Sequence, residues 1–142
     1  MTNLSDFAKQ KLHKMLIKDE GFKEFPYKDS VGKLTIGIGR NLDDRGITLG
    51  EALYLLANDI DQSIKDCRIA IKNYDSLTEN RKLVLIDMVF NLGLPKFLTF
   101  KKMIRAILLG NNADVAKEML ESKWHDDVGD RAKRLAELWL GG

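Results

Sequence analysis

The stretch Asp19–Arg40 reads DEGFKEFPYKDSVGKLTIGIGR and decides the fold. Around it most of the chain has apolar residues at helical spacing, but here the pattern changes to alternation. That change predicts strands over residues 25–28 and 33–38. The residues between them, Asp29–Gly32, include a glycine and are typical of a hairpin connection. A third short strand is predicted near Gly46–Ile47.

The rest of the chain is predicted to be helical. Thr48 and Glu51 have the T-x-x-E spacing of a capping box, which predicts the start of a long helix, and Ser76 and Glu79 repeat this spacing. Residues 83–92 are apolar on nearly every side, so their helix is expected at the centre of the core. The predicted helices cover residues 4–20, 48–72, 81–93, 99–109, 113–124 and 131–140.

These elements predict an α+β protein, mostly helical, with one small antiparallel sheet of three strands. Gly110 is expected to end one of the shorter helices, and Asp130 to cap the last one. We expect a single domain over residues 1–142, because a chain of this length can bury its own core. It is predicted to have a sheet lobe at about 21–47, a bridging helix at about 48–72, and a helical lobe at about 76–142 that includes the N-terminal helix.

Composition and charge exclude several classes of function. The formal net charge is +2, with 23 basic and 21 acidic residues, which gives no basic footprint for nucleic acid. The single cysteine, Cys67, cannot form an intramolecular disulfide and is expected to be a small buried side chain. His13 and His125 have no ligand spacing, so a structural or surface role is expected rather than a metal site. We expect no signal peptide, because the N-terminus has no apolar core segment, and no membrane span.

The glycines of the opening stretch allow two interpretations. Gly37 and Gly39 follow a predicted strand, as in a dinucleotide-binding loop, but the third glycine of that motif is replaced by Leu42 and no βαβ unit surrounds it. The alternative is that glycines two residues apart remove side chains from one face of the strand. A ligand or another backbone can then approach closely.

Two carboxylates flank the first predicted strand. Glu20 ends the first predicted helix, where the negative end of the helix dipole favours a protonated carboxyl group. Asp29 lies in the hairpin connection and is free to stay ionised. Glycoside hydrolysis uses this division between an acid and a base. The alternative is that both are solvated surface acids, with Asp29 present as a good turn residue.

The residues themselves resemble a known family. The pattern E-G-x-x-x-x-x-Y-K-D-S-x-G-x-x-T-I-G-I-G over Glu20–Gly39 is similar to that of the phage lysozyme family, T-even phage type. The similarity continues at RKLVLIDMVFNLG (Arg81–Gly93) and at SKWHDDVGDRAKR (Ser122–Arg134). The resemblance therefore spans nearly the whole chain and implies a lysozyme-like fold.

The resemblance implies roles for the matching positions. Glu20 is expected to be the general acid, and Thr35 a group that hydrogen-bonds the attacking water. Asp29 is expected either to act as the base or to hold and orient this water. An inverting reaction follows, with the two carboxyl groups roughly 6.5–9.5 Å apart. Arg131 matches the arginine that pairs with the catalytic glutamate. Phe90 matches an aromatic residue that lines the cleft, and Trp124 matches a tryptophan packed beneath it. Core packing is the alternative for both, and we favour it for Trp124.

The chain departs from the T-even type at several of these positions. Arg40 replaces a histidine that pairs with an aspartate on the long helix, so we expect an ion pair between Arg40 and Asp59. Arginine keeps its charge at any accessible pH, unlike histidine. The positions that match other substrate contacts also differ, and they are predicted to bind substrate here: Asn41, Phe100 and Glu118.

We therefore expect a muramidase that cleaves the β-1,4 bond between N-acetylmuramic acid and N-acetylglucosamine without metal or cofactor. Its partner is bacterial peptidoglycan. The family implies a monomer that waits in the bacterial cytoplasm until a holin-type partner releases it to the periplasm and cell wall, or a phage tail module. Alternatives are a lytic transglycosylase, which does not need both Asp29 and Thr35, and a non-catalytic wall-binding module. A DNA-binding protein is the most distant alternative.

Overall fold

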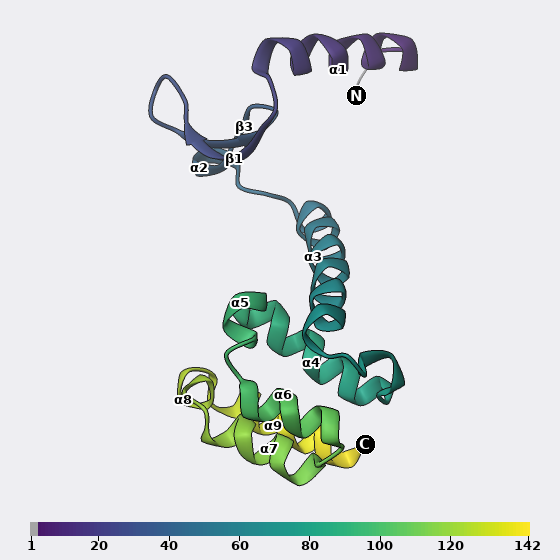
Figure 1. Ribbon diagram of the computed structural model, residues 1–142. Helices are drawn as coiled ribbons and strands as arrows, with labels where there is room; N and C mark the ends of the chain where they lie inside the picture. The colour runs from purple at the N-terminus through teal and green to yellow at the C-terminus, as the bar shows by residue number, and fades with distance from the viewer. Residues whose placement is uncertain (1–2) are drawn as a thin grey trace. The chain divides into compact units, whose positions relative to one another are not determined.

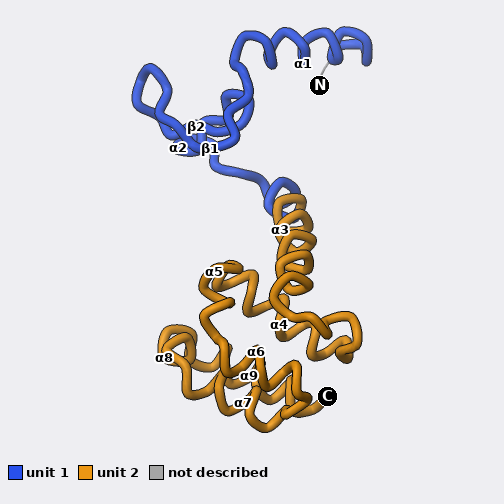
Figure 2. The backbone as a smooth tube through the Cα atoms, in the orientation of Figure 1, with its two compact units in different colours: residues 1–53 blue, residues 54–142 orange. Residues whose placement is uncertain are grey.

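The computed structural model describes residues 3–142 and divides the chain into two compact units (Figure 2). The first extends to residue 53 and the second covers residues 54–142. The predicted class is confirmed, because the protein is mostly helical with one small antiparallel sheet of three strands (Figure 1). The more detailed division into a sheet lobe, a bridging helix and a helical lobe stays a prediction.

The first unit begins with a helix whose two ends are defined by local hydrogen bonds. This helix, α1, spans Asp6–Glu20. The Ala8 N–H donates to the Ser5 hydroxyl at its start, and the Gly21 N–H donates to the Ile17 carbonyl at its end. Gly21 has a φ of 71°, a conformation that favours glycine, so the predicted stop is confirmed. Glu20 is consequently the last residue of the helix.

The sheet has the order β1-β2-β3, with both pairs antiparallel. The strands are β1 (Lys23–Lys28), β2 (Leu34–Gly37) and β3 (Arg40–Asn41). Thr35 pairs with Tyr27 on one side and with Asn41 on the other, so it lies in the middle strand. The predicted hairpin of the first two strands is confirmed.

The third strand is not where the sequence predicted it. Residues 46–47 are not a strand, because Gly46 ends a short helix, α2 (Leu42–Arg45), that was not predicted. Asn41 caps α2 by accepting a hydrogen bond from the Asp44 N–H. The predicted capping box that follows is confirmed: the Glu51 N–H donates to Thr48 Oγ1, and the Thr48 N–H donates to Glu51 Oε1. It opens α3 (Leu49–Ala70), which runs into the second unit.

The second unit contains the apolar core of the described residues. Its other helices are α4 (Glu79–Leu92), α5 (Leu94–Phe97), α6 (Lys101–Leu109), α7 (Asn112–Glu121), α8 (Lys123–Val128) and α9 (Asp130–Gly141). Four residues of α4 are buried, which confirms its predicted central place: Val84, Leu85, Met88 and Val89. Helix α9 packs against α4, α7 and α8 (Figure 1).

Three predicted helix ends in this unit need correction, and one is confirmed. Thr78 caps α4, because its hydroxyl accepts from the Arg81 N–H, whereas the Ser76 hydroxyl donates to the Asn73 carbonyl. Gly129, not Asp130, is the capping position of α9. The predicted helix over residues 113–124 is two helices separated at Ser122, which caps α8. Gly110 ends α6 in the left-handed conformation, as predicted.

Cys67 is fully buried in the core, as its apolar neighbours indicated. Burial raises the pKa of its thiol to about 12. Within residues 3–142, none of the helices is both long enough and apolar enough to cross a bilayer.

Candidate active site

Glu20 lies directly against the turn between β2 and β3. A Cβ atom placed on Gly39 would be 2.8 Å from Glu20 Oε2 and 3.0 Å from its Cδ. Gly39 also has a φ of 68°, which side chains rarely adopt. The group close to Gly39 is the carboxyl of Glu20, whereas the sequence suggested a ligand or another backbone. Among residues 3–142, apart from Gly37 and its two chain neighbours, no atom lies within 4 Å of the equivalent position on Gly37.

Asp29 is held in the β1–β2 connection by its own side chain. Its Oδ1 accepts hydrogen bonds from the Val31 N–H at 3.0 Å and from the Lys33 N–H at 2.8 Å. Its backbone N–H donates to the Lys33 carbonyl at 2.9 Å, and its carbonyl accepts from the Gly32 N–H. These bonds close the turn around one carboxylate oxygen. Among the described residues, the other oxygen, Oδ2, accepts no hydrogen bond.

Thr35 follows on β2 and is only 3% exposed. Its hydroxyl donates to the carbonyl of Lys33 at 2.9 Å. A hydroxyl has one hydrogen to donate and two lone pairs. Because the hydroxyl hydrogen of Thr35 is already donated to Lys33, Oγ1 can only accept a hydrogen bond from a further ligand. The backbone of Lys33 holds both Asp29 and Thr35.

Lys33 and Leu34 are in turn held by two neighbouring acids of α2. Lys33 Nζ forms an ion pair with Asp44 Oδ1 at 3.1 Å, and the Leu34 N–H donates to Asp43 Oδ2 at 2.7 Å. Asn41, predicted to bind substrate, donates to Asp44 Oδ2 at 2.9 Å. Sequence reasoning missed these acids. The N-x-x-D spacing of Asn41 and Asp44, just before Gly46, is typical of a helix cap and could have indicated α2.

Within the first unit Arg40 binds Glu51, whereas the predicted ion pair between Arg40 and Asp59 joins the two units and stays a prediction. Arg40 Nη1 donates to Glu51 Oε1 at 2.8 Å and its Nη2 to Oε2 at 2.6 Å. Its Nη1 also donates to the Gly46 carbonyl. Glu51 is in the first turn of α3. The bond from Arg40, with that from the Thr48 backbone, lowers the pKa of Glu51 to about 2.

Arg131 pairs with Asp87 inside the second unit. Its Nε donates to Asp87 Oδ1 at 2.8 Å, and its Nη2 is 2.7 Å from the same oxygen. Asp87 belongs to α4, and Arg131 to the first turn of α9. The predicted pairing of Arg131 with Glu20 joins the two units and stays a prediction.

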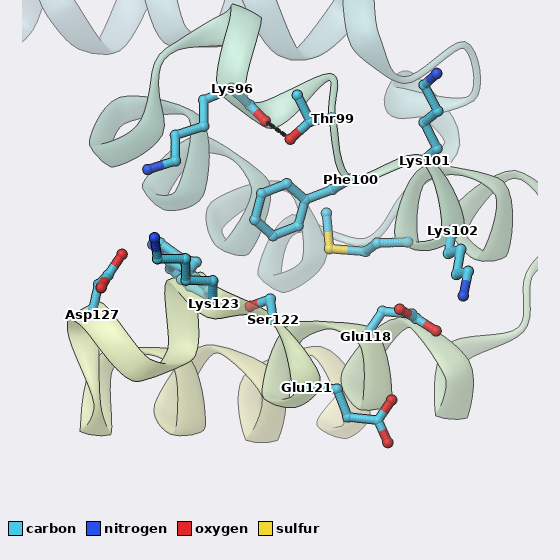
Figure 3. Close-up of a pocket in the computed structure, with 12 residues that line it drawn as sticks. Lys96, Thr99, Phe100, Lys101, Lys102, Glu118, Glu121, Ser122, Lys123 and Asp127 are labelled. Carbon is cyan, nitrogen blue, oxygen red and sulfur yellow. Dashed lines mark hydrogen bonds between the residues drawn. The ribbon is translucent and has the colours of Figure 1, made fainter.

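A pocket of about 470 Å³ lies in the second unit, between the start of α6 and the facing parts of α7 and α8 (Figure 3). Two predicted substrate-binding residues, Phe100 and Glu118, line it, and Phe100 stacks on Phe97 with ring centroids 6.4 Å apart. The wall of the pocket carries both positively and negatively charged side chains. The charged residues are Lys96, Lys101, Lys102, Lys123, Glu118, Glu121 and Asp127.

The two remaining aromatic predictions have different outcomes. Trp124 is 3% exposed and donates from Nε1 to Asn91 Oδ1 at 2.8 Å, so the core-packing interpretation is confirmed, although its edge also lines the pocket. Phe90 is partly exposed on α4 and is not among the residues of the pocket wall. Its predicted contact with substrate stays a prediction.

The first unit thus combines a carboxyl group at a helix end, a second carboxylate fixed in a hairpin and a buried hydroxyl beside it. These are the groups that a two-carboxylate glycosidase uses. The family model described as phage lysozyme matches residues 17–138. The chain therefore belongs to the phage lysozyme family, and at the level of the family it is a lysozyme-type glycosidase with peptidoglycan as its class of substrate.

Individual relatives agree with this assignment. The chain is 29% identical to probable T4-type lysozyme 2 of Dictyostelium discoideum, over 92% of this chain and 94% of that protein. It is 32% identical to probable T4-type lysozyme 1 of the same organism, over 87% and 90% of the two chains. It is also 24% identical to the pre-baseplate central spike protein Gp5 of Enterobacteria phage T4, over 96% of this chain but 29% of that protein.

Proposed function

We propose that this protein is a muramidase that hydrolyses the β-1,4 bond between N-acetylmuramic acid and N-acetylglucosamine with inversion. The observation that carries the proposal is the hairpin, which fixes Asp29 and Thr35 through the backbone of one residue, Lys33. A surface acid in an ordinary turn needs no buried hydroxyl beside it. The shared anchor is therefore better explained by a common ligand than by turn formation alone.

The chemistry follows from the free positions on each group. Glu20 gives its proton to the glycosidic oxygen as the bond from that oxygen to the sugar C1 breaks. A water attacks C1 from the opposite face, and Asp29 takes its proton through the unoccupied Oδ2. Because the Thr35 hydroxyl donates to the Lys33 carbonyl, its oxygen accepts the second hydrogen of this water. The water lone pair is then directed at C1.

The pocket of the second unit supplies a proposed binding site for the substrate. Phe100 offers an aromatic face, on which sugar rings can pack, and Glu118 offers an acceptor for sugar hydroxyl or amide groups. The surrounding lysines attract the carboxylates of peptidoglycan stem peptides. Phe90 and Asn41 complete the proposed set of substrate contacts, and Arg131 supports Glu20.

We further propose that the protein acts in phage-type lysis of a host cell, as a monomer. In this proposal it stays in the bacterial cytoplasm until a holin-type partner lets it reach the periplasm and the cell wall. The family assignment supports this role. The similarity to a pre-baseplate central spike protein supports delivery by a phage tail as a specific alternative.

The proposal is tested by mass spectrometry of purified peptidoglycan after digestion, with Glu20→Gln and Asp29→Asn as inactive variants. Wild type should release fragments with reducing N-acetylmuramic acid ends, and each variant should be slower by roughly 10²–10⁴-fold, the usual contribution of an acid or base. Glu24→Gln is the matched control, because Glu24 is another acid of the first unit, on β1. NMR of the first product should show the α-anomer.

Other outcomes would overturn the proposal in distinct ways. Anhydro-muramic ends would identify a lytic transglycosylase. Binding to intact sacculi without any release would identify a wall-binding module. An equal loss of hydrolysis rate in Glu24→Gln and Glu20→Gln would show that Glu20 is not the general acid.

A further inference from the structure

The catalytic groups of the first unit depend on two consecutive backbone positions. The Lys33 N–H holds Asp29 Oδ1 at 2.8 Å, and the Lys33 carbonyl receives the Thr35 hydroxyl at 2.9 Å and the Asp29 N–H at 2.9 Å. A displacement of Lys33 therefore moves both groups that are proposed to hold the attacking water. Leu34 lies between Lys33 and Thr35 in β2, so a displacement of its backbone also displaces these two residues.

Helix α2 holds the same two positions from outside the hairpin. Asp43 Oδ2 accepts from the Leu34 N–H at 2.7 Å, a short distance that is typical of a charge-assisted bond. Asp44 Oδ1 pairs with Lys33 Nζ at 3.1 Å, while Asn41 fixes the other Asp44 oxygen. Neighbouring residues of α2 thus bind neighbouring residues of the hairpin, which resists both translation and rotation of the segment.

We infer that Asp43 and Asp44 are positioning residues, which set the places of Asp29 and Thr35 through Leu34 and Lys33. This inference rests on the proposed function, because it assigns these acids to the same reaction. Neither acid touches the substrate in this account. Their role is to keep the water-binding groups at the distances that hydrolysis requires.

The alternative is that the two acids only cap α2 and stabilise the fold. The Lys33–Asp44 pair is exposed, with side-chain exposures of 42% and 55%, and such pairs contribute little to stability. A merely structural role therefore predicts small effects on every property. A positioning role predicts a disproportionate effect on turnover, because catalysis is sensitive to displacements of about 1 Å.

The chain contains a matched control for this test. Asn111 and Asp114 form the same cap at the start of α7: Asn111 Nδ2 donates to Asp114 Oδ2 at 2.7 Å, and the Asp114 N–H donates to Asn111 Oδ1 at 3.3 Å. The equivalent bonds of Asn41 and Asp44 are both 2.9 Å. Asp114 belongs to the other unit. Asp114→Ala therefore removes an equivalent cap without touching the proposed positioning contacts.

The experiment measures kcat and KM on soluble peptidoglycan fragments for Asp43→Ala, Asp43→Asn, Asp44→Ala and Asp114→Ala. We expect Asp43→Ala to lower kcat by roughly tenfold with little change in KM, the loss of one charge-assisted positioning bond. Asp43→Asn keeps an acceptor oxygen and should recover most of the rate. Asp44→Ala should lower kcat by a smaller factor, and Asp114→Ala should leave kcat unchanged.

A double-mutant cycle isolates the contribution of Asp44. Lys33→Met removes the ammonium group but keeps the backbone that holds Asp29 and Thr35. If Asp44 acts through Lys33, Asp44→Ala should cause no further fall in kcat in the Lys33→Met background. Independent, additive losses would overturn this half of the inference.

A second readout does not depend on turnover. Hydrogen exchange at the Lys33 and Leu34 amides, followed by NMR, should become faster in Asp43→Ala than in Asp43→Asn or Asp114→Ala. The wild type could fail to hydrolyse peptidoglycan while the two amides still exchange faster in Asp43→Ala. That result would reject the proposed function but keep the positioning contacts. Unchanged exchange and a kcat equal to that of Asp114→Ala would overturn the inference, whatever the substrate. If Asp43→Ala does not fold, Asp43→Asn combined with Asp44→Asn gives the same comparison with the shape retained.

Discussion

The two units of this protein are stabilised by different interactions. In the second unit, helices α4, α6, α7 and α9 enclose a continuous set of buried apolar side chains. In the first unit, Thr35 is the one buried residue among those described, and its hydroxyl is hydrogen-bonded. Side chains of Asp29, Asp43 and Arg40 instead bond to backbone groups of the hairpin and of the residue after α2.

This difference connects each unit with what it is able to do. Apolar packing is non-directional and tolerates small shifts of individual atoms. Hydrogen bonds have defined distances and angles, so a network of them places polar groups accurately but contributes modestly to stability. The proposed catalytic groups belong to the hydrogen-bonded unit. We therefore expect mutations to affect stability most in the second unit and turnover most in the first.

The largest effect on stability is expected from Trp139→Ala. Trp139 is fully buried, donates from Nε1 to Asn112 Oδ1 at 3.1 Å and lies under the guanidinium of Arg81. Truncation of a buried aromatic side chain costs about 3–5 kcal/mol. Urea denaturation measures this loss, with Leu140→Ala as the control, since Leu140 is 55% exposed. Similar losses for the two variants would contradict the assignment of the core.

Gly39→Ala is expected to be the most informative change in the first unit. Two effects combine there: a φ of 68°, which costs about 1–2 kcal/mol for a residue with a side chain, and a Cβ placed 2.8 Å from Glu20 Oε2. Gly37→Ala is the matched control, because Gly37 has a φ of 69° but open space at its Cβ position. Both variants should lose similar stability in thermal melts.

Only Gly39→Ala should also displace Glu20 and lower the rate of peptidoglycan hydrolysis, by roughly tenfold or more. Equal rates for the two alanine variants would show that the contact with Gly39 does not set the position of Glu20.

A smaller effect, dependent on pH, is expected from Arg40→Met. Glu51 has its pKa lowered from 4.5 to about 2 by Arg40 and Thr48. Because the pKa of Glu51 is lower in the folded protein, the ionised carboxylate stabilises the fold at pH values above 4.5, the value in the unfolded chain. This stabilisation is lost as the pH falls toward 2. The melting temperature of Arg40→Met should therefore be lower than that of wild type at pH 6, and the two should converge near pH 2.

Arg68→Met is the control for this pH dependence. Arg68 pairs with Asp75 at 3.1 Å in a more exposed position, without a capping box. A difference between wild type and Arg40→Met that persists unchanged at pH 2 would mean that Arg40 acts through packing rather than through Glu51.

The smallest effect is expected from thiol reagents. Cys67 is fully buried and its pKa is raised to about 12, so the native protein should hardly react with iodoacetamide at pH 8. Mass spectrometry measures the labelled fraction, and urea-unfolded protein serves as the positive control. Rapid labelling without denaturant would show that the core of the second unit opens readily.

Much of the fold was determined by local sequence signals. The hairpin around Asp29, the stops at Gly21 and Gly110, and the capping box of Thr48 and Glu51 all depend on residues within a few positions of one another. Their conformations follow from the geometry of short segments. The family motif likewise identified Glu20, Asp29 and Thr35 as the candidate site.

What the sequence did not reveal depends on contacts between segments. A strand of two residues, β3, has too short a pattern to detect, and it forms because Thr35 and Ile36 offer a partner edge. The sequence offers Arg40 several acids as partners, and its bonds to the Gly46 carbonyl and to Glu51 depend on the path of the chain between these residues. The bonds from Asp43 and Asp44 to the hairpin join residues about ten positions apart. Local pattern determined the elements and the reactive residues, but tertiary structure alone decided which polar groups hold them, because a hydrogen bond depends on distances that sequence spacing does not specify.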